Sequence, residues 1–421
     1  MEPNHRRPVR WQHSLRALLI DALTVGNLDR WLKYGGQPND ADDLKNRVLH
    51  IIAASKHLSG ASVMVHHLAS ASAELDAKNT VGKTPLLIAC ENGNLECMQA
   101  LLEVGAHVRI GDSVDGETPL HVASRMGSEE CVTMLLPYYP SADITNKLGG
   151  SPLISACWGG KLGCMSLLLD WGASIEIDGL DGRALEIACF THHTASVQML
   201  LKRGASSAPQ DNGITLLMQA CRHAEKMPPR ELLSLLLALP DTDVNALTRS
   251  DSTSVLDMAV MSGHTEMVWI LLAAGADPNS AYAARSRRGT ITMSMVTRSP
   301  LVVACRRRNP EMVRMLLDSG ACTDDSEAAE ALEESISGVH TAQPKPGVMD
   351  IVRQLLKAGV STRSLREGTS RNLACMWQRA EHELTAAHAE VANLQSLQTK
   401  AQELFVGIAL EARRTRPQVR F

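Results

Sequence analysis

Cysteine and histidine are the side chains of this 421-residue chain that could do chemistry, because thiolates and imidazoles bind zinc and take part in catalysis. The ten cysteines form no C-x-x-C pair. Eight of them fall at two positions of a recurring pattern, either directly after an Ala or early in a Leu- and Met-rich stretch: Cys90, Cys157, Cys189, Cys221 and Cys305, then Cys97, Cys131 and Cys164. Such placement is typical of small buried residues in layered packing. It predicts free thiols, no zinc site, and a reducing compartment, the cytoplasm or the nucleus.

Two pairs of adjacent histidines, His66-His67 and His192-His193, raise the question of a metal site. Neighbouring residues on a helix point about 100° apart, so the two rings of a pair do not converge on one ion. The sequence also contains no glycine-rich phosphate loop, no nucleophile elbow and no arrangement of paired acids. We therefore expect no catalytic residues, no metal and no cofactor, and predict that the protein is not an enzyme.

A Leu followed three residues later by an Ala recurs along most of the chain. Successive copies lie 34, 33, 32, 32, 39 and 45 residues apart, at Leu86/Ala89, Leu120/Ala123, Leu153/Ala156, Leu185/Ala188, Leu217/Ala220, Leu256/Ala259 and Leu301/Ala304. A second marker, a Leu pair followed by Gly, keeps the same phase at Leu102/Gly105, Leu169/Gly172, Leu201/Gly204, Leu272/Gly275, Leu317/Gly320 and Leu356/Gly359. Two markers in phase indicate an array of one structural unit.

The residues around these markers predict the structure of one unit. A hydroxyl residue followed by Pro, as at Thr84-Pro85 and Thr118-Pro119, is the preferred start of a helix. A Gly such as Gly93 can end that helix, and a second helix with Leu and Met at helical spacing then closes on the marker Gly. Each unit is predicted to be a helical hairpin plus a polar turn. One hairpin cannot bury its apolar face alone, so neighbouring units must stack.

The stretch from Gly116 to Leu136, GETPLHVASRMGSEECVTMLL, resembles the repeat of the ankyrin family, through Gly116, Thr118, Pro119, Leu120, His121, Ala123, Gly127, Leu135 and Leu136. The resemblance covers about residues 14–363 and is most specific between Gly82 and Gly204. It implies an all-α solenoid of stacked hairpins, in which His121 packs and hydrogen-bonds between units. Degenerate units are expected at Leu15–Asn39, Val48–Lys78 and Gly347–Thr362, with a basic extension over residues 1–13 ahead of them.

In ankyrin repeats the residue two positions after the framework Ala faces a concave groove, which the turn tips, such as Asp112 and Asp115, also line. The resemblance therefore implies a protein-binding row at Glu91, Arg125, Trp158, Phe190, Arg222, Met261 and Arg306. Aromatic side chains are enriched at binding hot spots, so Trp158 and Phe190 are the expected apolar anchors. The three arginines are expected to select acidic groups on the ligand. The alternative is that the two aromatic rings are tucked against an adjacent turn.

A long insertion at residues 280–298 carries Arg285, Arg287, Arg288 and Arg298, and Arg306–Arg308 follow it. This basic patch could dock an acidic peptide or a phosphate group, or the insertion could be a solvated loop. The net charge of −4 and the lack of a long basic face predict no nucleic-acid partner. No apolar run approaches the roughly 18–20 residues of a membrane span, so no membrane insertion is expected.

Apolar residues recur in steps of four and three between Leu373 and Ile408, interrupted by Gln398. The pattern predicts a long amphipathic helix over residues 371–413 that needs a partner along its seam, followed by a basic tail at 414–421. The partner could be a second copy of the chain, in a coiled coil through residues 373–408, or the last repeat, which the helix would cap. Another protein is the third possibility.

These features together predict a non-enzymatic scaffold or adaptor that binds a segment of a partner protein in the ankyrin groove. Two alternatives remain open at this point. One is a substrate-receptor subunit of a ubiquitin ligase, although no short helical box that would recruit such a ligase is recognisable after Arg371. The other is a structural subunit of a larger assembly.

Overall fold

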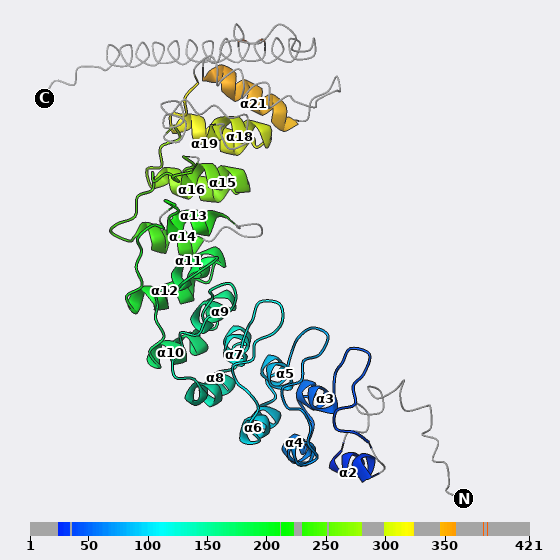
Figure 1. Cartoon of the computed structure of the whole chain (residues 1–421). Helices are drawn as coiled ribbons and strands as arrows, with labels where there is room; N and C mark the ends of the chain where they lie inside the picture. Colours follow the sequence, from blue (N-terminus) through cyan, green and yellow to red (C-terminus); the bar gives the residue numbers. More distant parts are fainter. Residues whose placement is uncertain are drawn as a thin grey trace, which may run out of the picture. The chain divides into compact units, whose positions relative to one another are not determined.

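The computed structural model describes residues 24–33, 36–210, 212–222, 230–250, 252–279, 299–323 and 346–358, together with His382 and Thr385, which are both helical. Within these residues the chain forms pairs of short helices and one small two-stranded sheet (Figure 1). Several predictions concern other residues. The basic extension at 1–13, the insertion at 280–298, the seam at 373–408 apart from His382 and Thr385, and the tail at 414–421 lie outside the described residues.

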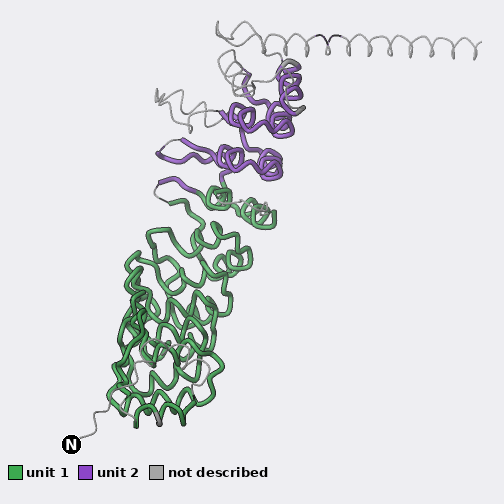
Figure 2. Tube along the Cα trace, turned by 90° about the vertical axis from the view of Figure 1, so that its right-hand side faces the viewer, with its two compact units in different colours: residues 1–210, 215–223, 229–242 green, residues 211–214, 224–228, 243–421 purple. Residues whose placement is uncertain are grey.

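The chain divides into two compact units, shown in Figure 2. Unit 1 comprises residues 1–210, 215–223 and 229–242, and unit 2 comprises residues 211–214, 224–228 and 243–421. The division follows the repeat at which the spacing between Leu markers lengthens from 32 residues to the 39 between Leu217 and Leu256.

Unit 1 consists of two rows of stacked helices. The first-helix row holds α3 (Val48–Ala54), α5 (Pro85–Asn92), α7 (Pro119–Met126), α9 (Pro152–Trp158), α11 (Ala184–Phe190) and α13 (Leu216–Arg222). The second-helix row holds α2 (Val25–Lys33), α4 (Ala61–Ser70), α6 (Leu95–Glu103), α8 (Glu129–Leu135), α10 (Leu162–Asp170) and α12 (Thr194–Lys202), and α14 (Arg230–Leu237) pairs with α13. From α3 to α12 the helices contact their neighbours within each row and the partner in their own hairpin, and α2 contacts α4. The degenerate repeat predicted at Val48–Lys78 is thus a complete hairpin, α3 with α4.

Short elements complete unit 1. The 3-10 helix η1 (Leu136–Tyr138) extends α8, and strands β1 (Asp178–Gly179) and β2 (Gly182–Arg183) pair antiparallel in the turn before α11. We call the turn before each first helix a finger, for example residues 78–83 before α5 and 111–117 before α7. Each of these two fingers is closed by one side chain: Asn79 Oδ1 accepts the N–H of Lys83 (2.9 Å), and Asp112 Oδ1 accepts that of Gly116 (2.8 Å).

Unit 2 repeats the same hairpins. Helices α15 (Val255–Ser262) and α18 (Pro300–Arg306) contact each other as first helices, and α16 (Thr265–Ala273) and α19 (Pro310–Asp318) do so as second helices. Helix α21 (Pro346–Lys357) packs on α19 and so takes a second-helix place, in the segment where a degenerate repeat is predicted at Gly347–Thr362. Val348, Ile351, Val352 and Leu355 bury the face of α21 at helical spacing.

Side-chain helix caps are present at three of the pairs in which a hydroxyl residue precedes Pro. Thr84, Ser151 and Ser299 each accept an N–H from the first turn of the following helix through the side-chain hydroxyl, at 3.3, 3.3 and 3.4 Å. Gly93 and Gly127 end α5 and α7 in the left-handed conformation, with φ of 63° and 84°. A side chain with a Cβ is strained there, so these glycines let the chain reverse into the second helix.

The cysteines lie where the repeat pattern predicts. All eight that fall at the two repeat positions are buried with free thiols. Burial raises the pKa of Cys97 and of Cys221 to about 12, so that both thiols are protonated at neutral pH. They act as small apolar residues between stacked helices.

The position after the marker Leu joins one repeat to the next. At His121 the ring is fully buried, and Nε2 lies 2.9 Å from the carbonyl oxygen of Gly150 in the following repeat. Nδ1 accepts the N–H of Thr118 at 3.3 Å, so the ring is neutral with its proton on Nε2. Burial lowers the pKa of His121 to about 4. The prediction that this residue packs and hydrogen-bonds between units is confirmed.

The same position holds a carboxylate in a later repeat of unit 1. Glu186 is 2% exposed, accepts the N–H of Arg183 at 2.9 Å and lies 2.6 Å from its guanidinium. Arg183 also reaches Glu176, just before its own finger (3.0 Å), and the carbonyl oxygen of Ala208 in the next repeat (2.9 Å). This buried ion pair escaped the sequence analysis, because the repeat pattern marks the position as a packing site and not as an ionic one.

The prediction for the second histidine pair assumed that both residues lie on a helix, and this assumption was wrong. His66 and His67 do lie on α4, where their rings contact different partners, Ser62 and Asp29. His192 and His193 instead lie in the turn between α11 and α12, and His192 adopts a φ of 59° with its Nε2 2.7 Å from the carbonyl oxygen of Ala220. The left-handed residue is needed here because this turn carries a Thr and no Gly at the end of its first helix.

Among the described helices, none combines the length and the apolar character that crossing a bilayer requires.

Candidate protein-binding surface

The seven predicted site residues lie at the C-terminal ends of the first helices. Five belong to unit 1, one on each of α5, α7, α9, α11 and α13: Glu91, Arg125, Trp158, Phe190 and Arg222. Because these helices are stacked side by side, the five side chains form one row along unit 1, which we call the unit 1 row. Met261 on α15 and Arg306 on α18 hold the same position in unit 2. Arg222 and Arg306 are exposed.

Trp158 and Phe190 contact each other across neighbouring repeats. Their ring centroids lie 5.6 Å apart with 75° between the ring planes, which is the edge-to-face arrangement that aromatic quadrupoles favour. Trp158 remains 39% exposed and Phe190 is half-buried. The rings therefore support each other without leaving the surface, and neither is tucked away in the core.

The two charged members of the unit 1 row that precede Trp158 already have partners. Glu91 accepts both of its ion-pair hydrogen bonds from Lys83 Nζ, at 2.7 and 2.8 Å, and Arg125 Nη2 lies 3.1 Å from Glu117 Oε2. Arg125 therefore already has one acidic partner within its own repeat, and its selection of acidic groups on a ligand stays a prediction. The physical reason is that each finger brings its last residue beside the end of its own first helix.

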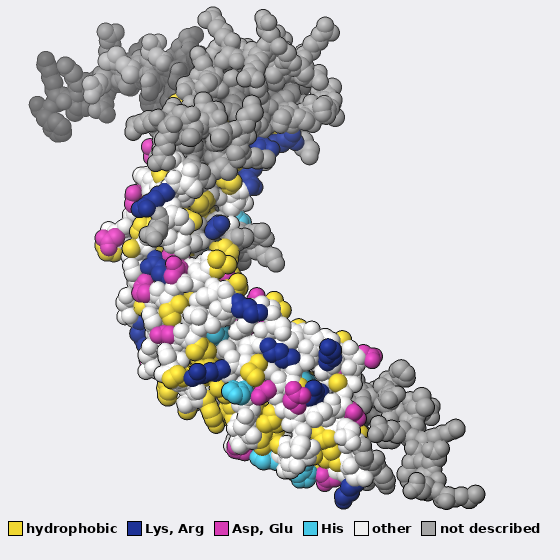
Figure 3. Space-filling model, in the orientation of Figure 1, with side chains coloured by type: hydrophobic (Ala, Val, Ile, Leu, Met, Phe, Trp, Pro, Cys, Tyr) yellow, Lys and Arg dark blue, Asp and Glu magenta, His cyan; other side chains and the backbone are white. Residues whose placement is uncertain are grey.

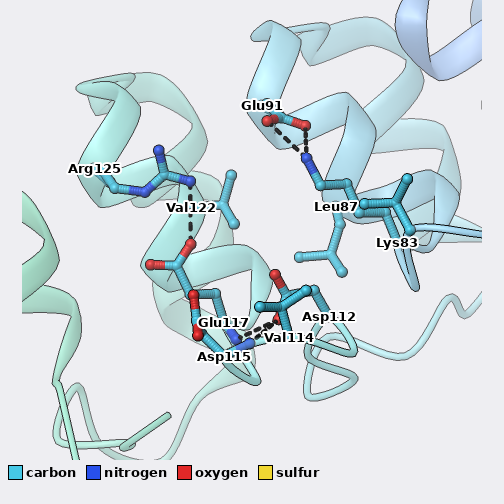
Figure 4. Close-up of a pocket in the computed structure, with 10 residues that line it drawn as sticks. Lys83, Leu87, Glu91, Asp112, Val114, Asp115, Glu117, Val122 and Arg125 are labelled. Carbon is cyan, nitrogen blue, oxygen red and sulfur yellow. Dashed lines mark hydrogen bonds and ion pairs between the residues drawn. The ribbon is translucent and has the colours of Figure 1, made fainter. Parts of the chain in front are cut away.

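A cavity of about 380 Å³ lies between these two ion pairs, as Figure 4 shows. Lys83 and Glu91 stand on one side of it, Glu117 and Arg125 on the other, and Leu87 and Val122 between them. The fingers before α5 and α7 supply the remaining lining residues, Val81, Asp112, Val114 and Asp115. The cavity is thus built from two consecutive repeats of unit 1.

Four residues that line the cavity are not marked by the repeat pattern: Lys83, Glu117, Val81 and Val114. A signal for the first two exists, since the residue before the helix N-cap and the unit 1 row residue eight positions later have opposite charges in two repeats, Lys83 with Glu91 and Glu117 with Arg125. In the next two repeats the first of these positions is a glycine, Gly150 or Gly182, and the row residue is Trp158 or Phe190. Charged repeats and aromatic repeats therefore follow each other in blocks.

The wider surface carries no concentrated charge on the face seen in Figure 3. Basic, acidic and hydrophobic side chains are interspersed over the described residues of that face. A second, shallower depression of about 300 Å³ lies on the second-helix row, where Leu162 on α10 meets Met199 and Lys202 on α12. Its aliphatic lining is small compared with the cavity between α5 and α7.

Comparison with known proteins identifies the repeats. Residues 49–147 match a family model described as ankyrin repeats in three copies, and residues 252–282 and 298–327 match the single ankyrin repeat. The chain is 30% identical over 264 residues to the E3 ubiquitin-protein ligase KEG of Arabidopsis thaliana, and 34% identical over 180 residues to the B-cell lymphoma 3 protein homolog of Mus musculus. These alignments cover 58% and 42% of this chain.

The chain spans only 15% and 36% of the length of those two relatives. Among solved structures, the human ASB11 ankyrin repeat domain is 28% identical, with a TM-score of 0.45 over 55% of this chain and 98% of that one. The family models match the segments in which the structure shows paired helices in repeat register. The chain is therefore an ankyrin-repeat protein, and its repeats constitute a protein–protein interaction domain of a fold that is typically non-enzymatic.

Proposed function

We propose that unit 1 is a scaffold that binds an extended segment of a partner protein along the unit 1 row. The observation that carries this proposal is the exposed edge-to-face pair of Trp158 and Phe190 on α9 and α11. Large aromatic side chains held rigidly at a surface are the commonest energetic centres of protein interfaces. The pair offers such a centre because each ring limits the motion of the other.

The spacing of the row suits an extended ligand. Neighbouring packed helices lie about 8–10 Å apart, and an extended chain rises about 3.3 Å per residue. A segment that crosses unit 1 therefore meets a new repeat about every three residues. One large apolar side chain of the partner would contact Trp158 and Phe190 together, since the two rings touch.

The proposal predicts that Trp158→Ala combined with Phe190→Ala weakens partner binding by about 2 kcal/mol, in the range of hot-spot truncations. The measurement is affinity capture of partners by the full-length protein, with quantification of each captured protein. Trp171→Ala is the matched control, because Trp171 is also exposed (49%) but ends α10 in the second-helix row. Partners kept by the Trp171 variant and lost by the double variant support the proposal, whereas partners kept equally by both would contradict it. Circular dichroism checks that the helices are intact.

The wider role that we propose is that of an adaptor in the cytoplasm or the nucleus. The nine described cysteines are all free, which supports a reducing compartment. The predicted seam at residues 373–408 would link the bound segment to a second copy of the chain or to another protein. That part of the proposal rests on the heptad pattern alone.

The similarity to the ligase KEG favours one alternative, a substrate receptor of a ubiquitin ligase. In that role the unit 1 row would hold the substrate and another part of the chain would contact the ligase. Co-purification of a cullin-type protein with the full-length chain would support this alternative. A subunit of a larger assembly would instead be stable only together with its neighbours.

A further inference from the structure

The cavity between α5 and α7 carries more acid than base. Four carboxylates line it, those of Glu91, Asp112, Asp115 and Glu117, and two cations face them, Lys83 and Arg125. Two negative charges are therefore uncompensated within the lining. Lys78 and Lys147 lie near the same finger, but their ammonium groups donate to the backbone carbonyls of Gly111 and Ser113, each at 2.7 Å, and neither lines the cavity.

Asp115 is the carboxylate with no ion pair or side-chain hydrogen bond among the described residues. Its backbone is held in place, because its N–H donates to Asp112 Oδ1 (3.0 Å) and its carbonyl accepts the N–H of Lys147 (2.8 Å). The side chain is half-buried and lines the cavity. Asp115 thus offers a positioned, partly desolvated negative charge.

The two existing ion pairs do not close the cavity to a further cation. Their members are partly exposed, and ion pairs in such settings are weak, so they rearrange easily. An additional cation between them would share the carboxylates of Glu117 and Asp115 instead of displacing a buried partner.

Apolar groups surround the acidic ones. Val81 and Val114 stand at the finger tips and are 55% and 67% exposed, and the buried Leu87 and Val122 lie below them. A side chain that combines an aliphatic stem with a cationic end can cover the valines while its head group reaches the carboxylates. Among the side chains of proteins, only arginine and lysine combine these two properties.

From this charge complementarity we infer that the cavity receives one arginine or lysine side chain of the partner segment. The inference rests on the proposed function and names the chemistry of the ligand at this place. The cavity lies between α5 and α7, and the aromatic pair lies on α9 and α11, two repeats further along the row. Two repeats of about 8–10 Å correspond to roughly five or six residues of extended chain. The partner segment therefore carries a basic residue about five or six positions from its large apolar residue.

Selection from a library of random twelve-residue peptides displayed on phage, against the full-length chain, tests this inference. We expect Arg or Lys to be enriched at a set distance from an aromatic or large aliphatic residue. Two synthetic probes follow from the strongest sequence, the selected peptide and its counterpart with the basic residue changed to Gln. Fluorescence polarisation then measures both probes on each variant of the protein.

Asp115→Asn should weaken binding of the basic probe about fivefold and binding of the Gln probe less than twofold. Such a difference shows that Asp115 and the basic residue of the peptide interact, because changes at two independent sites would have additive effects. Asp181→Asn is the control, since Asp181 is another aspartate of a finger in unit 1 but lies two repeats away, beyond the screening length of about 8–10 Å. It should change neither probe by more than twofold. Both variants should keep the thermal midpoint of the wild-type protein.

The outcomes separate the inference from the function on which it rests. Peptides that lose affinity on Trp158→Ala but show no preference for a basic residue, or prefer an acidic one, overturn the inference and leave the proposed function standing. Equal effects of Asp115→Asn on the two probes also overturn the inference. A library that yields no binding peptide, or only peptides that ignore Trp158→Ala, overturns the proposed function as well.

Discussion

At the scale of the residue, one position of the repeat shows how the same place serves different chemistry. The residue after the marker Leu is His50, Leu87, His121, Ile154 or Glu186 in successive repeats of unit 1, and in each case it is buried. Polar residues are tolerated there only because each has a hydrogen-bond partner in the same finger or in the next repeat. For His121 this partner is the carbonyl oxygen of Gly150. The neutral form of His121 is part of this arrangement, since both ring nitrogens are engaged.

The lowered pKa of His121 predicts a loss of stability in mild acid. The unfolded chain takes up a proton on this ring near pH 6.5, whereas the folded chain does so only near pH 4. Between these values the unfolded state binds more protons, so the free energy of unfolding falls as the pH falls, by up to about 3 kcal/mol from this group. His121→Leu, which copies Leu87 in the preceding repeat, should flatten that dependence.

Urea unfolding at several pH values between 7 and 4 measures the effect, as the difference between variant and wild type. His107→Gln, at an exposed histidine of the same repeat array, is the control substitution. His50, whose pKa is also lowered by burial, retains a part of the dependence in every variant. A parallel loss of stability in the wild type and in His121→Leu would show that this ring does not titrate as expected.

At the scale of the element, side chains that cross from one repeat to the next hold the hairpins in register. Asp76, Asp143 and Glu176 each accept a backbone N–H from the following repeat, at 2.9, 2.7 and 2.8 Å. Asn245 and Asn279 do the same in unit 2, at 2.8 and 2.7 Å. These bonds satisfy N–H groups where the chain leaves a second helix. The same hydrogen bond therefore pairs a backbone group after the helix and joins two neighbouring repeats.

Within one repeat, the ion pair of Arg183 with the buried Glu186 holds the start of α11, and it can be tested. Arg183→Met should destabilise unit 1 by about 3 kcal/mol, because Glu186 would keep its charge in the interior without its partner. Adding Glu186→Leu should recover most of the loss, since the position accepts Leu87 and Ile154 in other repeats. Thermal unfolding of the two variants measures the recovery in stability. A double variant no more stable than Arg183→Met would mean that the guanidinium stabilises unit 1 through its contact with Ala208 and not through its charge.

At the scale of the whole molecule, the array presents one row residue per repeat, and the chemistry of these residues changes along the chain. The unit 1 row passes from a charged block at α5 and α7 to an aromatic block at α9 and α11. A ligand that fits both blocks must carry two kinds of side chain at a set spacing, which is a more specific requirement than either block imposes alone. In the proposed function, the order of the repeats would thus set the specificity for the partner segment.

The predicted seam at residues 373–408 makes self-association the expected state of the full-length chain. Size-exclusion chromatography with light scattering should give twice the chain mass for the full-length protein. A variant in which Leu384 and Val391 in the seam are both changed to Asp should give the mass of one chain, because charges at seam positions oppose pairing. A monomer in both cases, with a lower thermal midpoint for the variant, would indicate that the helix caps the last repeat instead.

The sequence by itself determined the period of the repeat, the helix boundaries near the Thr-Pro and Gly positions, the burial of eight cysteines and the place of the unit 1 row, as Thr84, Gly93 and Cys90 illustrate. These properties are local and periodic, because capping and helical spacing depend on residues a few positions apart. Only the tertiary structure decided that Glu117 forms an ion pair with Arg125, that Trp158 contacts Phe190, and that Glu186 is buried beside Arg183. Such pairings depend on how far one finger or helix stands from the next, and that distance is set by the packing of whole repeats, which residue spacing does not encode.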